Sequence, residues 1–133
     1  RGQPHRVGSN AGYAAPGLLG RKHIHRRAQD INRGEAAMIG VVATLTIAEG
    51  KESEFEAVGK DLMAKVKANE PGTLTYQLYR SQKDPQTYVF LEQYASQDAL
   101  DAHGQSDYFK AAMPKIGGCL AGAPDIQRFD IVE

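Results

Sequence analysis

The sequence contains no tryptophan, one cysteine and no long apolar run, and each absence excludes a class of protein. Because Cys119 is alone, no disulfide can form within the chain, which is typical of a reducing compartment, and we expect a cytoplasmic location. No apolar stretch approaches the ~20 residues of a membrane-spanning helix, and residues 1–37 lack the apolar segment of a secretory signal. These absences predict a protein with no membrane partner.

Metal ligands are also scarce. Residues 38–133 contain one histidine, His103, and one cysteine, Cys119, whereas a structural zinc site needs about four such ligands. The pair Gly117-Gly118 is not followed by the lysine of a phosphate-binding loop. The sequence therefore predicts neither a metal site nor a phosphate-binding motif in this part of the chain.

Acidic and basic residues balance overall but are unevenly distributed. Residues 1–37 hold seven Lys or Arg against two acidic residues, and residues 38–133 hold nine against fourteen. No helical or strand period runs through the first segment, while a β-branched stretch begins directly at Met38. We predict a basic N-terminal extension, or an expression or processed leader, over residues 1–37, and one folded domain over residues 38–133.

The extension could also be an arm for an anionic partner. Its densest basic stretch, residues 21–27, holds four Lys or Arg and two His. Nucleic-acid-binding segments commonly combine such charges with aromatic side chains that stack on bases, and this stretch has none. We therefore expect no nucleic-acid partner.

Alternating and helical periods divide residues 38–133 into seven elements. Strands are expected over residues 38–47, 73–81, 87–94 and 125–132. A helix over residues 52–68 carries one apolar stripe, and two shorter helices, capped by Ser96 and Ser106, precede the last strand. This order predicts the α+β class: a ferredoxin-like split β-α-β fold with an antiparallel four-stranded sheet and helices on one face. Because the open face would keep apolar residues, we expect a homodimer packed sheet against sheet.

The side chains with chemical potential concentrate between residues 87 and 109. The third strand is expected to turn one aromatic-rich face toward the helices, formed by Tyr88, Phe90, Glu92 and Tyr94. The helices that follow add His103 and an aromatic pair at residues 108–109. We predict a pocket with this strand as its floor and the helices as its cover.

Five segments within residues 38–132 match the pattern of a known family. They read G-K-E-S-E-F-E (50–56), E-P-G-T-L-T-Y (70–76), Y-V-F-L-E-Q-Y (88–94), S-Q-D-A-L-D-A-H (96–103) and S-D-Y-F (106–109). In these segments the chain resembles the antibiotic biosynthesis monooxygenase family, and within it the small quinol-monooxygenase-like proteins. The resemblance implies a dimeric α/β barrel with a pocket in each subunit, between the sheet and the second helical region.

The resemblance also implies a chemistry. Some members oxidise quinols or polycyclic phenols with molecular oxygen and need neither a metal nor a flavin. We therefore expect a monooxygenase that uses no cofactor and acts on a small aromatic or quinol substrate with molecular oxygen. Such a reaction needs a base, because a deprotonated phenol can pass an electron to oxygen, and a site that holds the ring and excludes water.

We predict roles for seven residues. His103 is the expected base, because an imidazole titrates near neutral pH, and Glu92 is the carboxylate expected to orient it or raise its basicity. The substrate is expected to lie against an aromatic wall formed by Tyr76, Phe90, Tyr94, Tyr108 and Phe109. Other interpretations stay open: His103 could bond helix-end carbonyls, Glu92 could anchor the turn at Ser96, and the aromatic residues could belong to the core.

Departures from the family pattern narrow the function. Many members have tryptophan where this chain has Tyr94, and the asparagine of haem-degrading relatives has no counterpart, since Asn69 lies in a turn. Haem degradation is therefore disfavoured. Two alternatives remain. One is a non-catalytic, ligand-binding dimer; the other is an isomerase or clearance enzyme for a small phosphorylated signalling sugar, which would need Arg80, Lys110 or Arg128 in the pocket.

Overall fold

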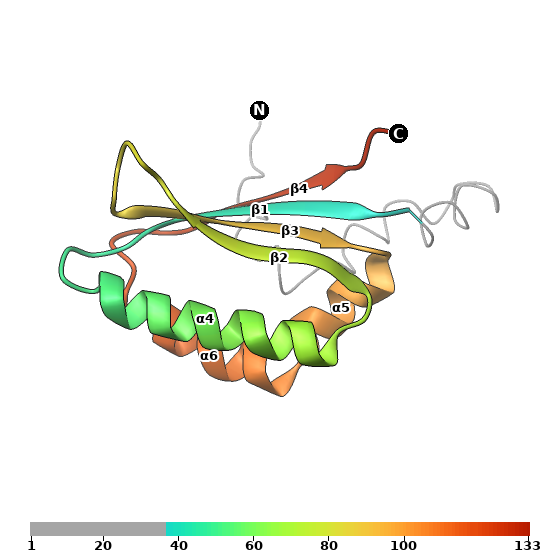
Figure 1. Cartoon of the computed structure of the whole chain (residues 1–133), viewed down its shortest axis with the longest axis horizontal. Helices are drawn as coiled ribbons and strands as arrows, with labels where there is room; N and C mark the ends of the chain where they lie inside the picture. Colours follow the sequence, from blue (N-terminus) through green and yellow to red (C-terminus); the bar gives the residue numbers. More distant parts are fainter. Residues whose placement is uncertain (1–36) are drawn as a thin grey trace, which may run out of the picture.

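The computed structural model describes residues 37–133, and its helices lie on one face of a single sheet (Figure 1). The elements, in chain order, are β1 (Ile39–Thr46), α4 (Glu52–Asn69), β2 (Thr73–Arg80), β3 (Thr87–Tyr94), α5 (Gln97–Gln105), α6 (Asp107–Gly117) and β4 (Asp125–Asp130). Neighbouring strands are antiparallel, in the order β2-β3-β1-β4. The predicted α+β ferredoxin-like fold is confirmed. Residues 1–36 of the predicted extension lie outside the described residues.

The middle of the sheet is formed by β1 and β3. Val41, Ala43 and Leu45 of β1 are buried against the helices and pair in register with the buried face of β3. A strand whose neighbours lie on both sides exposes no backbone edge, which suits the charge-free, β-branched sequence of β1. The core therefore lies between these two strands and the helices.

Helix α4 is tied to β3 by both apolar and polar contacts. The ring of Phe55 meets that of Tyr88 edge to face, with centroids 4.8 Å apart. The Tyr88 hydroxyl donates a hydrogen bond of 2.5 Å to Oε2 of Glu56. Burial of this hydroxyl and its bond to Glu56 raise the pKa of Tyr88 to about 12, so it remains a donor.

The two shorter helices begin at the serine caps that the sequence predicted. Ser96 Oγ accepts a hydrogen bond from the backbone N–H of Ala99 at 3.2 Å, and Ser106 Oγ accepts one from Phe109 at 3.3 Å. Ser106 is also the residue that separates α5 from α6. Since Ser96 lies only two residues after the end of β3, it sets the position of His103 on α5 relative to the sheet.

The start of β2 differs from the prediction. The register between β2 and β3 shifts between Thr73 and Thr75, and Leu74 at this irregularity is 50% exposed. Strict alternation along the predicted strand would place Leu74 on the same face as Tyr76 and Leu78, both of which pack against the core. An extra residue in one strand breaks the alternation of side chains at that point.

Neither Gly104 nor Pro114 ends a helix. Helix α5 continues through Gly104 to Gln105, and α6 contains Pro114 and continues to Gly117. Among residues 37–133, no helix combines the length and the apolarity needed to cross a membrane.

We predict that Gly72→Ala destabilises the fold. Gly72 lies just before β2, where an added Cβ would be 2.8 Å from the Cβ of Ala99 on α5. The contact involves no flexible side-chain end, so α5 itself must move, and overpacking of this kind costs about 1–3 kcal/mol of unfolding free energy. Urea denaturation followed by circular dichroism measures the change.

Gly122→Ala is the matched control, because no atom lies within 4 Å of the added Cβ there. It should change the unfolding free energy by less than about 0.5 kcal/mol. An equal effect of the two substitutions would contradict the close approach of Gly72 and α5.

Candidate active site

His103 lies in the interior of the protein, surrounded by aromatic rings. Its side chain is fully buried on α5. The imidazole centroid is 4.9 Å from the ring of Tyr76, 5.5 Å from that of Tyr94 and 4.6 Å from that of Phe109. Phe90 stacks on Tyr76 at 5.1 Å. The structure therefore brings together His103 and four of the five residues of the predicted aromatic wall.

The carboxylate beside Nδ1 of His103 belongs to Glu70. Both carboxylate oxygens lie 3.1 Å from Nδ1. Thr73 Oγ1 donates to Oε1 at 2.5 Å, and the Tyr108 hydroxyl donates to Oε2. Glu70, with its side chain only 7% exposed, thus collects donors from β2, α5 and α6.

These contacts favour the ionised form of Glu70. Burial by itself raises the pKa of this carboxyl, but the hydrogen bonds from His103, Thr73 and Tyr108 outweigh burial and hold the pKa below its ordinary value. Burial, followed by the bond to Glu70, raises the pKa of Tyr108 to about 12, so this phenol stays protonated and donates. The cluster is therefore a buried anion held by hydroxyl donors, next to an imidazole.

The sequence alone assigned Glu70 no role in the site. The available signal was its position in the E-P-G-T-L-T-Y segment, directly before a strand that pairs with β3. Thr73 pairs with Tyr94, one residue before the chain turns toward α5. This pairing brings the α4–β2 turn close to α5, and the N–H of Ala95 donates to the Gly72 carbonyl at 2.8 Å.

Glu92 and Tyr94 form a second buried polar pair. The Tyr94 hydroxyl donates to Oε1 of Glu92 at 2.6 Å, and both side chains are buried. Burial, together with the negative charge of Glu92, raises the pKa of Tyr94 far above its ordinary value. Glu92 also pairs across the strands with Tyr76 on the same face of the sheet. The expected action of Glu92 on His103 stays a prediction, since the carboxylate at Nδ1 is Glu70.

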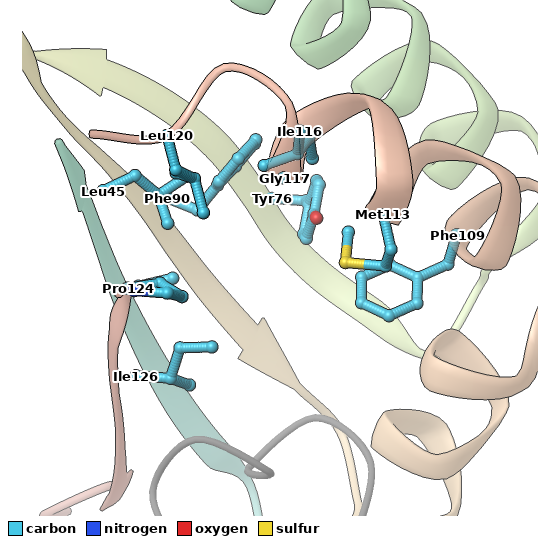
Figure 2. Close-up of a pocket in the computed structure, with 11 residues that line it drawn as sticks. Leu45, Tyr76, Phe90, Phe109, Met113, Ile116, Gly117, Leu120, Pro124 and Ile126 are labelled. Carbon is cyan, nitrogen blue, oxygen red and sulfur yellow. The ribbon is translucent and has the colours of Figure 1, made fainter. Parts of the chain in front are cut away.

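A cavity of about 200 Å³ lies between the sheet, α6 and the segment before β4 (Figure 2). It is lined by Ala43, Leu45, Tyr76, Phe90, Phe109, Met113, Ile116, Gly117, Leu120, Pro124 and Ile126. The hydroxyl of Tyr76 is the only oxygen that these side chains bring to it. This pocket is apolar and marked by a single hydrogen-bonding side chain.

Three of the predicted wall residues, Tyr76, Phe90 and Phe109, line this pocket. His103 does not line it; its ring packs behind those of Tyr76 and Phe109. Tyr108 lies at a different hollow, a groove between α4 and α6. The sequence did not indicate the contribution of the segment after α6, because no periodic pattern runs through residues 117–124.

In the part of the chain that the structure describes, no Lys or Arg lines this apolar pocket. Arg80 lies 3.4 Å from Glu56, and Arg128 donates to Gln97 at 2.8 Å. The isomerase alternative required a cation in the pocket, so it fails this test. Within residues 37–133, no three His, Cys, Asp or Glu side chains are grouped as a metal site would require.

The fold and the pocket define a class: small ferredoxin-like α+β proteins that enclose an apolar pocket beside a buried histidine. The family model for antibiotic biosynthesis monooxygenase matches residues 38–115, and the chain belongs to this family. The resemblance expected from the sequence is thereby confirmed.

Two solved structures and one further protein sequence are similar to this chain. A presumed antibiotic biosynthesis monooxygenase from Caulobacter crescentus is 54% identical, with a TM-score of 0.73, over 79% of this chain and 99% of that one. A conserved protein from Methanosarcina mazei is 29% identical, with a TM-score of 0.67, over 71% of this chain and 92% of that one. An uncharacterized Synechocystis protein, sll1783, is 27% identical over 106 residues, which cover 80% of this chain and 71% of the relative.

We predict that the stabilising effect of Glu70 depends on pH. A carboxyl whose folded pKa is lowered contributes stability above its unfolded pKa, ordinarily about 4.5, and this contribution is lost as the pH falls through the lowered folded value. Glu70→Gln should therefore lower the unfolding free energy by about 1–3 kcal/mol at neutral pH, the usual cost of disrupting a buried, hydrogen-bonded charge.

Urea denaturation at a series of pH values tests this expectation. The difference between the parent and Glu70→Gln should shrink as the pH is lowered from about 5 to about 3. The exposed Glu49, changed to Gln, serves as the control and should follow the parent at every pH. A difference that stays constant over this range would contradict an ionised Glu70.

Proposed function

We propose that this chain is a cofactor-independent monooxygenase that oxidises a quinol or a related small aromatic with molecular oxygen. The observation that carries the proposal is the apolar pocket, whose one side-chain oxygen, on Tyr76, belongs to a ring packed against the buried His103. Membership of the antibiotic biosynthesis monooxygenase family supports the same class of reaction.

The lining of the pocket favours a flat, weakly polar ligand. An aromatic ring can replace water against Phe90, Phe109 and Met113 without leaving a polar group unpaired. One phenolic hydroxyl on that ring can bond to the hydroxyl of Tyr76. A phosphorylated sugar would lose its hydration and find no cation among these lining residues in return.

In the proposed reaction the substrate supplies all the electrons. A quinol and oxygen yield a hydroxyquinone and water, so no external reductant is needed. His103 takes the hydroxyl proton by way of the Tyr76 hydroxyl, the phenolate passes an electron to oxygen, and the two radicals join to form the new C–O bond. The proton returns to the outer oxygen of the resulting peroxide, the O–O bond breaks, and the ring carbon loses its hydrogen as a proton, so that its new C–O bond becomes a carbonyl. That proton and the departing hydroxide leave as water. Glu92 lies on the same sheet face as Tyr76 and contributes a negative charge to this region.

We predict that His103→Gln lowers kcat for oxygen uptake with the best quinol of a panel by at least about 100-fold, the usual effect of removing a general base. Tyr76→Phe should also lower kcat/KM, because it removes the only side-chain hydroxyl of the pocket. An oxygen electrode measures both rates.

Tyr79→Phe is the matched control for the second variant. It makes the same change on the same strand, but its ring is 53% exposed and does not line the pocket. Parent-like rates for His103→Gln, or no uptake with any quinol, would overturn the proposal. Saturable quinol binding without oxygen uptake would instead favour a non-catalytic ligand-binding protein.

We also propose that the chain forms a homodimer through the open face of its sheet. The helices cover the other face (Figure 1). On β2, β3 and β4, Tyr79, Leu91 and Phe129 are 53%, 36% and 47% exposed. Large apolar side chains that recur across one face of a sheet are typical of a surface that associates. This arrangement supports a second copy of the chain as the partner.

We predict that Leu91→Lys shifts the protein from dimer to monomer in sedimentation-velocity experiments. Leu91 is central to this face, since it pairs with Val42 on one side and Gln77 on the other. A buried lysine would lose its hydration without a partner. Ala64→Lys, on the exposed side of α4, should leave the dimer intact. A monomeric parent, or a dimeric Leu91→Lys, would contradict the proposed interface.

A further inference from the structure

We propose that Glu70 is the positioning residue of His103: its carboxylate holds the proton on Nδ1 and thereby reserves Nε2 as the atom that accepts a proton. The inference rests on the proposed function for its effect on catalysis. Its structural part, the tautomer of His103, can be measured without any substrate.

The geometry at Nδ1 supports this role. Both oxygens of Glu70 lie 3.1 Å from Nδ1, within hydrogen-bonding distance of an N–H donor. A carboxylate can only accept, so the neutral imidazole must carry its proton on Nδ1 to make this bond. The other ring nitrogen then has the lone pair. A general base that alternated between tautomers would spend part of its time unable to act.

The donors around Glu70 keep its carboxylate in place. Thr73 Oγ1 holds Oε1 from the start of β2, and the Tyr108 hydroxyl holds Oε2 from α6. Glu70 therefore cannot turn away from His103 without breaking bonds to two other elements. When Nε2 accepts a proton, the positive charge of the imidazolium faces a fixed negative charge.

An alternative role for Glu70, as a carrier that takes the proton from His103, fits the structure less well. Its pKa is lowered by the same three donors, so protonation is unfavourable. Tyr108, the next group along such a path, has its pKa raised to about 12 by burial and by Glu70, and it already donates to the carboxylate. Glu70 therefore stays ionised and Tyr108 stays protonated.

The direct test is ¹⁵N nuclear magnetic resonance of histidine-labelled full-length protein, at a pH where His103 is neutral. Four histidines give signals, and His103→Gln identifies the relevant one. We expect a protonated Nδ1 and an unprotonated Nε2 in the parent. In Glu70→Gln, whose amide can also donate to Nδ1, we expect the Nε2-protonated form to appear. A parent protonated on Nε2, or an unchanged tautomer in Glu70→Gln, would overturn the proposal.

Kinetics provide a second measurement. The value of kcat would not change on substitution of Glu70 if its role were purely structural. With an active quinol, Glu70→Gln should lower kcat at least about tenfold and leave KM within about threefold, because Glu70 does not line the pocket. Tyr108→Phe keeps the carboxylate and should retain the parent tautomer with a smaller loss of kcat. Glu49→Gln controls for loss of a negative charge. If Glu70→Gln lowered the unfolding free energy but left kcat at the parent value, the positioning role would be overturned.

The two proposals can fail separately. If the parent oxidises no quinol, the proposed function fails, while the tautomer measurement still decides the role of Glu70. If the parent is active and Glu70→Gln matches it in kcat and in tautomer, the positioning role fails and the proposed function stands.

Discussion

The buried carboxylate of Glu70 is the interaction on which the arrangement of the site depends. A charge in the interior is stable only when hydrogen-bond donors replace the water it has lost. Here the donors come from the start of β2, from α5 and from α6, at Thr73, His103 and Tyr108. All three elements must therefore occupy their observed positions together. The same contacts that satisfy the charge fix the orientation of the histidine.

The face of the sheet that the helices cover contains a polar region and an apolar region. Toward one end it carries polar groups, Glu92 and Tyr94, which satisfy each other through a short hydrogen bond. Elsewhere it carries Ala43, Leu45 and Phe90, which form the apolar floor of the pocket. The ring of Tyr76 lies between them and packs on both Phe90 and His103. An aromatic substrate in the pocket would thus be one ring away from a histidine that is itself shielded from solvent. In the proposed reaction, this separation keeps water from His103 and lets a single hydroxyl select the substrate's orientation.

The fold could be predicted from the sequence because its local signals agree with one another. The bounds of β3 follow from a run rich in aromatic and β-branched residues that ends shortly before Ser96. The serines at positions 96 and 106 cap the helices where they were expected to. The site was only partly predictable. His103 and Phe109 stood out as residue types, but Glu70 lies in a turn and gains its role from the pairing of β2 with β3. The exposed Leu74 follows from a register shift, which alternation cannot reveal. The direction of Tyr108, toward Glu70 and away from the pocket, depends on how α6 packs against α4.

The central claim is that an aromatic substrate binds in the apolar pocket with its hydroxyl at Tyr76. A crystal structure with a bound naphthol, which mimics the ring and the hydroxyl of a quinol, tests this most directly. The account predicts the ring between Phe90 and α6, with its oxygen within hydrogen-bonding distance of the Tyr76 hydroxyl. A naphthol bound instead in the groove between α4 and α6, with the pocket left without ligand, would contradict it.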